Sequence, residues 1–486
     1  MLRTRQLMLG LHLSLTLMFF YSFSMLPPVF IGLFFHEQAI WPFLQTFAAV
    51  ALVGGIGSQA TRQHRVGLKH RDGFWVLVLF WCLFSAVSAL PFLLSHELHL
   101  NVASAFFEAI SGITTTGASA LKDVDAAPKA FLYYRAQLNF CGGLGIIILA
   151  VALLPIIGTG GAKLYQTEAP GAAKDEKITP RLADTARSLW TVYAGLGLLC
   201  CLAYWLAGMN WFDALCHGIA TVSLGGFSTY GDSLAHFHSL AIELVAGGFS
   251  LLAAVNFALY FLALRRRSLG LLWRNAELRG FVGLVGCVIL FTCFWLWQAG
   301  QFGWQEALVH GFFQAASMMT DNGLGAAGYP DWPMPTVLVL VLASFFGGCV
   351  GSTCGGLKIM RLLILYRQLR QQILEAIHPY AVAPLKVGDK KAAGDILQSV
   401  SAFVFVYLAC TLLFIWGLSL TGLDLLSAIG TTAACINNMG IGYGVTGAGF
   451  DPLSDTAKWL MNLAMLFGRL EILPILIVIS PRYWRY

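Results

Sequence analysis

Four short segments of this chain, each ending at a glycine, recur at similar spacing. Their final glycines are Gly117, Gly226, Gly323 and Gly440, which lie 109, 97 and 117 residues apart, and each segment stands between two long apolar runs. The segments read FFEAISGITTTG (106–117), LCHGIATVSLGG (215–226), FFQAASMMTDNG (312–323) and IGTTAACINNMG (429–440). This register predicts four fused copies of a unit made of a span, a short helix, a glycine loop and a second span.

The apolar runs indicate a polytopic membrane protein. The chain is 58% hydrophobic and 11% charged, with a mean hydropathy of +0.72, whereas soluble proteins carry about 25% charged residues. A helix needs about 20 apolar residues to cross the hydrocarbon core. The first run follows Arg3 and Arg5 and is too long for a signal peptide, so we expect it to be retained. The predicted spans are 7–30, 40–58, 73–95, 136–158, 187–208, 238–263, 279–299, 334–365, 396–419 and 456–480.

The distribution of Lys and Arg predicts the topology. These residues gather in segments 62–71, 163–187, 265–279 and 358–391 and at the C-terminal tail, with Arg482 and Arg485. Cytoplasmic loops are enriched in Lys and Arg, so we expect these segments and both termini to face the cytoplasm. Every glycine loop falls in a cation-poor connection and is therefore expected to enter from the other side. That side carries acidic residues that would raise the local cation concentration: Asp123, Asp125, Asp232, Asp331, Asp451 and Asp455.

The glycine-loop segments are too short to span, so we interpret them as re-entrant helices. Irregular backbone at membrane depth is tolerated only where protein buries it or where it lines an aqueous cavity. Four helix C-termini, each carrying about −0.5 charge, would favour a cation on a shared axis. Backbone carbonyls after each helix could replace the hydration shell of the ion, and glycine allows the positive φ that such a turn needs. Small-residue helix packing is the alternative, but it explains neither the repeat nor its register.

Two further features lie within predicted spans. Segment 345–359 holds five glycines together with Ser and Thr, and each interior glycine costs about 1 kcal/mol in a helix. We therefore expect a break that acts as an intramembrane gate, or else tight helix packing; the phosphate-binding P-loop pattern is not matched, because Leu357 precedes Lys358. Arg469 stands in the last predicted span, where a charge should face the bundle interior or a cavity. It could form an electrostatic barrier in a pore, pair with Glu471 or another acid, or do both.

The chain resembles the TrkH-type transmembrane subunit of the Trk/Ktr/HKT superfamily of potassium transporters over nearly its whole length. The motifs that carry the resemblance occur in order and at the expected spacing: FFEAISGITTTGAS (106–119), GGLGIIILAVALLP (142–155), SLGGFST (223–229), GGCVGSTCGGLK (347–358), NNMGIG (437–442) and FGRLEI (467–472). The resemblance implies an all-α fold of four M1–pore helix–M2 repeats with pseudo-fourfold symmetry, preceded by two extra transmembrane helices. The expected divisions are 1–66 for the extra helices and 67–175, 176–275, 276–392 and 393–486 for the repeats.

The resemblance also implies roles for particular residues. Four glycines and the two residues before each would form a potassium filter: Thr115, Thr116 and Gly117; Leu224, Gly225 and Gly226; Asp321, Asn322 and Gly323; Asn438, Met439 and Gly440. The implied gate comprises Gly347, Gly348, Gly351, Gly355, Gly356, Lys358 and Arg469. Asp321 departs from the threonine-rich first loop, and its carboxylate could bond the filter scaffold or add negative charge to the conduction path.

The resemblance implies potassium as the transported ion, no tightly bound cofactor, a homodimer in a bacterial-type cytoplasmic membrane and a TrkA-type cytosolic subunit that binds nucleotide. The basic loops would be its docking surface, or a topology signal alone. Nucleic acid is not an expected partner. A symporter coupled to sodium or protons is the alternative, with Glu243 and Glu471 as its within-span acids. A polytopic membrane enzyme is a remote alternative, because the histidines are mostly single and in loops and show no metal-ligand spacing.

Overall fold

The computed structural model describes residues 2–62, 72–157, 178–379, 386–387, 390–391 and 394–485. Most of the basic segments 62–71 and 163–187 therefore lies outside the described residues. The described chain is helical apart from its loops and one short antiparallel hairpin, in which β1 (Lys386–Val387) pairs with β2 (Lys390–Lys391). The short 3₁₀ helices are η1 (Phe23–Met25), η2 (Gln38–Ile40), η4 (Ser233–Phe237), η5 (Tyr329–Asp331) and η6 (Gly444–Thr446).

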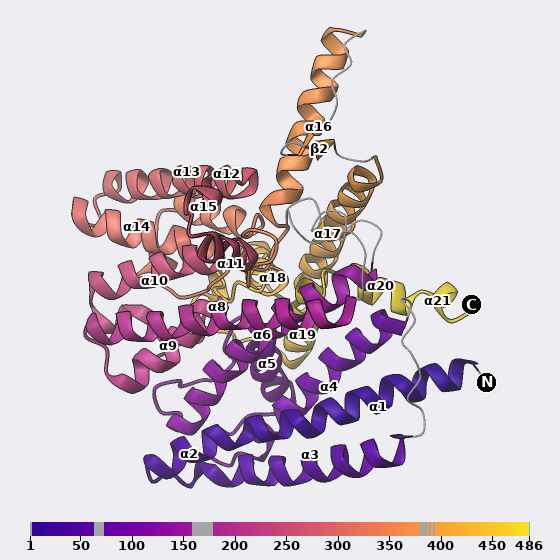
Figure 1. The fold of residues 1–486 in the computed structure, drawn as a ribbon. Helices are drawn as coiled ribbons and strands as arrows, with labels where there is room; N and C mark the ends of the chain where they lie inside the picture. Colours follow the sequence, from indigo (N-terminus) through magenta and orange to yellow (C-terminus); the bar gives the residue numbers. More distant parts are fainter. Residues whose placement is uncertain are drawn as a thin grey trace.

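The N-terminal part forms an antiparallel helical pair at one edge of the molecule (Figure 1). Helix α1 (Leu2–Ser22) continues through η1 into α2 (Leu26–Phe34), and α3 (Trp41–Ala60) returns beside it. Small residues permit this contact: a Cβ atom added at Gly54 would lie 2.7 Å from the backbone nitrogen of Phe19. Glycine at such positions lets helix backbones approach closely in a membrane.

The rest of the chain repeats one arrangement four times: a first helix, a short re-entrant helix and a second, often broken, helix. The first repeat has α4 (Asp72–Leu94), α5 (Val102–Ile113) and α6 (Lys129–Ile157). The second has α8 (Ile178–Leu206), α9 (Trp211–Ser223), α10 (Leu240–Ala253) and α11 (Phe257–Arg266), followed by α12 (Gly270–Arg274). The third has α13 (Ala276–Gln298), α14 (Trp304–Met319), α15 (Met334–Ser344) and α16 (Ile359–Ile377). The fourth has α17 (Gly394–Ser419), α18 (Leu425–Ile436), α19 (Asp455–Arg469), α20 (Leu473–Ile479) and α21 (Pro481–Arg485).

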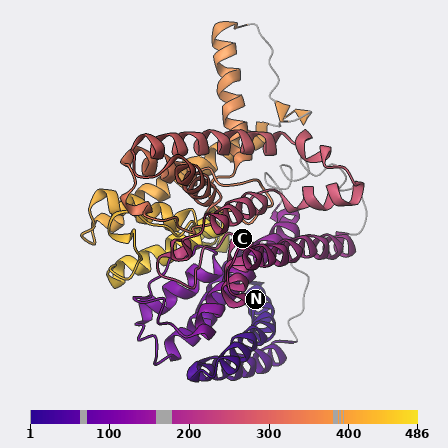
Figure 2. The ribbon, with the colours of Figure 1, turned by 90° about the vertical axis from the view of Figure 1, so that its left-hand side faces the viewer.

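The repeats close into a ring. The second helix of each repeat packs against the re-entrant helix of the next one: α6 on α9, α10 on α14, α15 on α18 and finally α19 on α5. Viewed from one side, the four repeats lie around a common centre in sequence order (Figure 2). This arrangement confirms the predicted pseudo-fourfold fold with two preceding helices.

The re-entrant helices begin with matching caps. Asn101, Asn210 and Asp424 precede α5, α9 and α18 at the same distance from the glycine of their own repeat, and each side chain accepts a hydrogen bond from a backbone N–H in the first turn. Such caps satisfy N–H groups that have no partner inside the helix. Helix α14 begins one turn earlier, after Gly303, whose N–H donates to Glu306. All four helices are too short to cross a bilayer.

Six helical stretches of the described chain are long and apolar enough to cross a membrane. They are Gly10–Phe34, Gln38–Ala60, Gly73–Leu94, Ala186–Leu206, Ala276–Gln298 and Ile396–Ser419. Each of the predicted spans 238–263 and 456–480 is divided by a bend that the sequence analysis did not predict, because α10 and α11 meet at 86° and α19 and α20 at 111°. The predicted break at 345–359 is confirmed: α15 ends at Ser344, and α16 begins at Ile359 and projects from the body (Figure 1).

Candidate functional site: a ring of four glycine loops

The four re-entrant helices end in the same backbone turn. In the first, the N–H of Thr116 donates to the carbonyl of Ser111 and that of Thr115 donates to the carbonyl of Gly112. The same pair of bonds ends α9, α14 and α18. This is the Schellman arrangement, which normally places glycine at its left-handed position. Here that position holds Thr115 (φ 53°), Leu224 (φ 53°), Asp321 (φ 60°) and Asn438 (φ 57°), a strained conformation of the kind that clusters at functional sites.

The glycines that follow form a closed ring. Gly117, Gly226, Gly323 and Gly440 have φ values of 80°, 67°, 77° and 86°, which an L side chain rarely adopts. A Cβ atom added at any of them would come well within 3.0 Å of a carbonyl oxygen in the neighbouring loop. The oxygens belong in turn to Gly225, Asn322, Met439 and Thr116. Four helix ends and four carbonyl groups are therefore gathered around one centre, as the sequence predicted.

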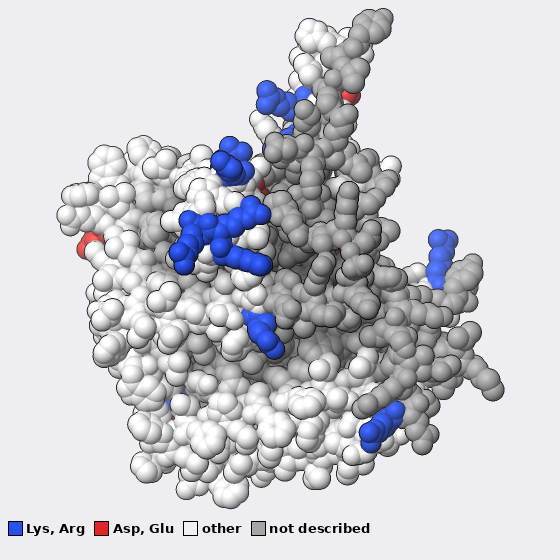
Figure 3. Space-filling model, in the orientation of Figure 1, with Lys and Arg blue, Asp and Glu red and all other residues white. Residues whose placement is uncertain are grey.

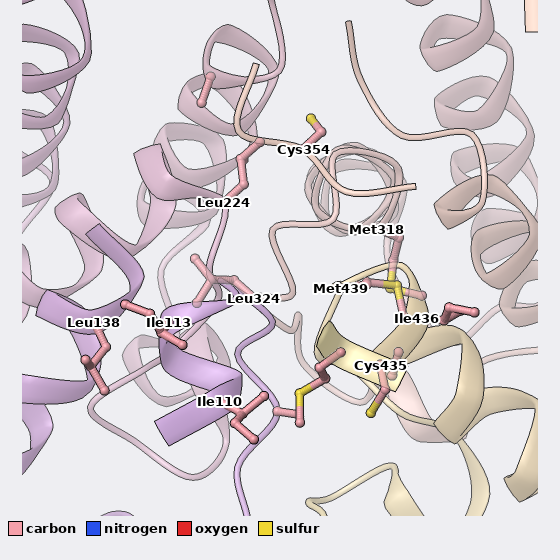
Figure 4. Close-up of a cluster of buried hydrophobic side chains, with 14 of the residues drawn as sticks. Ile110, Ile113, Leu138, Leu224, Met318, Leu324, Cys354, Cys435, Ile436 and Met439 are labelled. Carbon is pink, nitrogen blue, oxygen red and sulfur yellow. The ribbon is translucent and has the colours of Figure 1, made fainter. Parts of the chain in front are cut away.

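The side chains beside these glycines connect the loops to the surrounding helices. Asn322 donates to Ser250 of α10 at 2.7 Å, and Asn438 donates to Thr116 of the first loop at 2.9 Å and to the carbonyl of Met465 in α19 at 3.0 Å. Asn437 donates to Ser344 at 2.8 Å. Apolar side chains of the loops, of the neighbouring helices and of segment 345–358 pack around the ring (Figure 4), among them Ile110, Ile113, Leu138, Leu224, Met318, Leu324, Cys354, Cys435, Ile436 and Met439. The backbone ring is thus held on a rigid support.

A fourfold set of anchors, which the sequence analysis did not single out, holds the chain after each glycine. Each anchor lies on a re-entrant helix at the same distance before the glycine, and the four are Glu108, His217, Gln314 and Thr431. Glu108 accepts from the backbone N–H groups of Ala120 and Leu121 and from the hydroxyl of Ser119. His217 lies 2.9 Å from the hydroxyl of Ser228, Gln314 accepts from the N–H of Ala326, and Thr431 lies 2.8 Å from the hydroxyl of Thr446. The sequence does contain a signal for these anchors: when the four segments are aligned on their glycines, a polar residue occupies the same position in each.

A buried arginine connects the first two loops. Arg135 of α6 donates to Glu108 at 3.1 Å and to the carbonyl of Ser228 at 3.2 Å, and its guanidinium lies 4.1 Å from the centre of the Phe227 ring. Arg135 is 2% exposed and Glu108 is fully buried. A buried charge is stable only when it is paired and its hydrogen bonds are satisfied, and here one ion pair satisfies both groups.

The glycine-rich segment 345–358 forms an intramembrane loop that fits into the breaks of other helices. The N–H of Cys349 donates to the carbonyl of Ala254 at 2.9 Å, and the N–H of Phe257 donates to the carbonyl of Gly351 at 3.2 Å. These bonds fill the gap between α10 and α11. The hydroxyl of Thr353 donates to the carbonyl of Val222 near the end of α9 at 3.2 Å, while a Cβ atom at Gly355 would collide with the carbonyl of Asn437. The loop therefore lies against the ends of re-entrant helices.

Arg469 holds this loop from the other side. Its guanidinium donates to the carbonyl oxygen of Thr353 and to that of Gly142 in α6, each at 3.2 Å, and the side chain is 4% exposed. Glu471 instead accepts from Arg361. The ion pair between Arg469 and Glu471 that the sequence allowed is therefore not formed. Lys358, the other predicted basic residue of the gate, donates to the carbonyl of Cys354.

Asp321 is buried beside this loop. Neither carboxylate oxygen bonds the filter scaffold in the part of the chain that the structure describes, so the first of the two alternatives for this residue is not formed, and the backbone of Gly355 in the intramembrane loop lies next to the carboxylate. Lys358 and Arg469 lie within electrostatic range of it.

The six predicted outer acids are all exposed. Two of them also connect repeats: Asp125 accepts from the N–H of Gly231, and Asp455 accepts from the amide of Asn101. On the face drawn in Figure 3, basic side chains gather where α11, α12 and α16 lie, whereas the surface over α2 and α9 is largely uncharged. The basic side chains on this face are thus concentrated in one region.

Comparison with known proteins gives matches over almost the whole chain. The family TrkH, described as a cation transport protein, matches residues 39–486. The Trk system potassium uptake protein TrkG of Escherichia coli (strain K12) is 49% identical over 474 residues, which are 98% of each chain. The Trk system potassium uptake protein TrkH of Vibrio parahaemolyticus is 40% identical over 96% of each chain. The crystal structure of the potassium transporter TrkH from Vibrio parahaemolyticus superposes with a TM-score of 0.91 at 37% identity, covering 99% of this chain and 100% of that one.

Proposed function

This chain belongs to the TrkH family of cation transport proteins, and from that premise we propose that it carries potassium into the cell along one axis through the ring of glycine loops. The chain is a potassium uptake protein and not an enzyme. Its apolar helices suit the inner membrane, and we propose that both termini face the cytoplasm. The observation that carries the pore is the closed ring, in which each glycine lies against the carbonyl group of the neighbouring loop.

The ring supplies what a dehydrated potassium ion needs. We assign coordination to the backbone carbonyls of the two residues before each glycine, with the four glycines Gly117, Gly226, Gly323 and Gly440 giving the turn. The C-terminal ends of α5, α9, α14 and α18 add partial negative charge directed at the same centre. Carbonyl oxygens replace the hydration shell of the ion, and the buried anchors behind the loops keep the oxygens in place without reorganisation. Potassium is the transported ion in this account and is not a resident cofactor.

The intramembrane loop is the proposed gate. Its glycines at 347, 348, 351, 355 and 356 leave the backbone free of side chains that would fix its position, and three of them have positive φ. Arg469 and Thr353 hold the loop against the filter ends through the hydrogen bonds described above. Displacing the loop would open the route below the filter, and it would also free the positive charge of Arg469 from its carbonyl partners.

The fourfold repeat also sets the boundaries of the N-terminal helix pair and of the pore repeats. We propose an N-terminal pair at 1–66 and pore repeats at 67–175, 176–275, 276–392 and 393–486, the third repeat containing the gate. This division places one re-entrant helix and one glycine loop in each repeat.

The relatives are named as parts of a Trk system, so we propose that the chain works with a regulatory subunit. In finer detail, we propose a homodimer regulated by a TrkA-type cytosolic subunit that binds nucleotide. The exposed residues Arg265, Arg266, Arg267 and Arg274 and the projecting helix α16 support docking on this side. Because α10 and α11 meet at the intramembrane loop, force applied to this surface can reach the gate.

Passive conduction is favoured over symport. The two acids that could have coupled transport to another ion both have partners in the structure. Glu243 lies 2.6 Å from the Nδ1 atom of His310, and Glu471 accepts from Arg361. Both carboxylates are therefore engaged.

Flux into liposomes tests the proposal. Purified protein is reconstituted with potassium inside, and uptake of ⁸⁶Rb⁺ and ²²Na⁺ is measured for the wild type, for Arg469→Ala and for the control Arg370→Ala, whose side chain is exposed on α16. We expect ⁸⁶Rb⁺ uptake above that of ²²Na⁺, an increase in Arg469→Ala only, and no requirement for a proton or sodium gradient. Uptake that needs such a gradient would establish the symporter instead.

A further inference from the structure

Asp321 is a buried acid that the proposed conduction mechanism does not use. Its side chain is fully buried, it holds the left-handed position of the third loop, and both carboxylate oxygens have no hydrogen-bond partner among the described residues. An ionised carboxylate in such a place is costly unless a cation compensates it. The group is therefore accommodated either by taking up a proton or by positive charge in its surroundings.

The equivalent positions of two other loops also carry unpartnered oxygens. The hydroxyl of Thr115 and the amide oxygen of Asn438 are buried and have no hydrogen-bond partner in the described part of the chain. The fourth equivalent residue is Leu224, which has no polar side-chain atom. The fourth loop lies between the third and the first in the ring, so the three oxygen-bearing positions are consecutive around it. Buried polar groups are rarely left without partners unless an ion, a water molecule or a function accounts for them.

The compensating charges belong to the gate. Lys358 and Arg469 both lie within electrostatic range of Asp321, as do Cys354 and Tyr407, and the backbone of Gly355 in the intramembrane loop lies next to the carboxylate. Lys358 is bonded to the carbonyl of Cys354 in the intramembrane loop, and Arg469 is bonded to the carbonyl of Thr353. A movement of the loop that displaces these carbonyls releases both cations from their present positions. The carboxylate is then left beside the filter without its compensating charges.

We propose that Asp321, together with the side-chain oxygens of Asn438 and Thr115, forms an alkali-cation site at the end of the filter nearest the intramembrane loop, and that Lys358 and Arg469 compensate this site while the loop is in place. The inference rests on the proposed pore. A bound cation and the closed loop then compete, because the cation and the pair Lys358 and Arg469 neutralise the same carboxylate.

The chemistry of the site makes it less selective for potassium than the backbone filter. Selectivity among alkali cations depends on the number and field strength of the coordinating oxygens. A carboxylate carries a full charge and holds a small cation such as sodium more strongly than a carbonyl dipole does. The site should therefore bind sodium and potassium with little discrimination, although the carbonyl rings above it prefer potassium.

Equilibrium binding of ²²Na⁺ and ⁸⁶Rb⁺ to the purified full-length chain tests the site. We expect Asp321→Asn to lower sodium affinity by about tenfold, the effect of removing one partly compensated charge, and to change rubidium affinity much less. Arg469→Ala should raise sodium affinity, and Asp321→Asn combined with it should abolish the gain. Asparagine is compatible with the left-handed backbone, because Asn438 adopts it at the equivalent position. Asp321→Thr, which copies Thr115, provides a second variant if Asp321→Asn fails to fold.

The control is Asp331→Asn, which removes an exposed carboxylate of the same repeat and should leave both affinities unchanged. Unchanged sodium binding in folded Asp321→Asn would overturn the site and leave Asp321 as a counter-charge for Lys358 and Arg469. The liposome flux measurement separates this result from a failure of the pore. If the wild type conducts selectively and Asp321→Asn binds sodium as well as the wild type, the site is disproved and the pore is not. If Asp321→Asn loses sodium binding but no variant conducts any ion, Arg469→Ala included, the pore is disproved although a cation binds at Asp321.

Discussion

Arg135 and Glu108 form a buried ion pair, with Nε of the arginine 3.1 Å from Oε2 of the glutamate, and the two side chains are 2% and 0% exposed. Glu108 uses its other oxygen to hold the backbone after Gly117, and Arg135 reaches across to the carbonyl of Ser228 after Gly226. One pair therefore fixes the first two loops of the ring relative to each other. No such link was evident from the sequence, because Arg135 lies just before the predicted span 136–158, and its partners Glu108 and Ser228 are 27 and 93 residues away along the chain.

Removing one member of this pair should destabilise the protein strongly. Arg135→Met leaves Glu108 buried and unpaired, and the loss of one partner of a buried pair costs about 3–5 kcal/mol. We expect a large fall in the thermal unfolding temperature of the purified chain, together with reduced discrimination between rubidium and sodium. Glu108→Gln combined with Arg135→Met should recover part of the stability, because no uncompensated charge remains. Arg370→Met serves as the control, and an Arg135→Met variant as stable as this control would show that the pair is dispensable.

A side chain at a ring glycine should damage selectivity. In Gly117→Ser, the new Cβ would meet the carbonyl oxygen of Gly225, and the backbone would have to keep a φ of 80°. The loops must shift, so we expect the ratio of ⁸⁶Rb⁺ to ²²Na⁺ uptake to fall towards one. Gly195→Ser is the matched control, because a Cβ atom there meets nothing within 4 Å. Retained selectivity in Gly117→Ser would place the first loop outside the ion path.

The hydroxyl of Thr353 should help to keep the intramembrane loop closed. Thr353→Val keeps the shape of the side chain but loses the bond to the carbonyl of Val222, at a cost of about 1 kcal/mol. We expect cation flux to rise severalfold while selectivity stays the same, because the filter itself is untouched. Thr191→Val removes an exposed hydroxyl of α8 and should have no effect. A flux equal to that of the wild type would argue that this bond does not hold the gate.

The amide of Gln314 should be needed for the shape of the third loop. Its Oε1 atom accepts from the N–H of Ala326 at 2.8 Å. Gln314→Leu leaves this buried N–H without a partner, at a cost of about 1–3 kcal/mol, whereas Gln372→Leu makes the same change at an exposed glutamine of α16. We expect Gln314→Leu to lose both stability and selectivity, and Gln372→Leu to retain both. Equal behaviour of the two variants, measured by thermal unfolding and by flux, would remove the anchoring role.

The sequence predicted the repeat, the loops and the break at 345–359 because each has a local signal in glycine and in the period of apolar runs. It did not predict the bend between α10 and α11. No glycine or proline lies at 254–256, and the bend is satisfied by hydrogen bonds from Cys349 and to Gly351, residues distant in sequence. The bend after α19 had a weak signal in Pro474, which disfavours helical backbone in the residue before it.

The loop conformations show a similar limit. Gly117 and its equivalents could be predicted to take positive φ, because glycine does so without strain. Thr115, Leu224 and Asp321 could not, since propensity disfavours a left-handed conformation for them. The packing of four loops around one centre overrides that preference. Pairings such as that of Arg469 with Thr353 depend in the same way on where the repeats meet.

The most direct test of the account is the position of a bound ion. Anomalous scattering from crystals of the protein grown in rubidium chloride should give a peak at the centre of the ring, near the carbonyl oxygens of Thr116, Gly225, Asn322 and Met439. A peak there that disappears in Gly117→Ser would establish the four loops as one cation filter. Rubidium bound elsewhere in the membrane region, with none in the ring, would contradict the account.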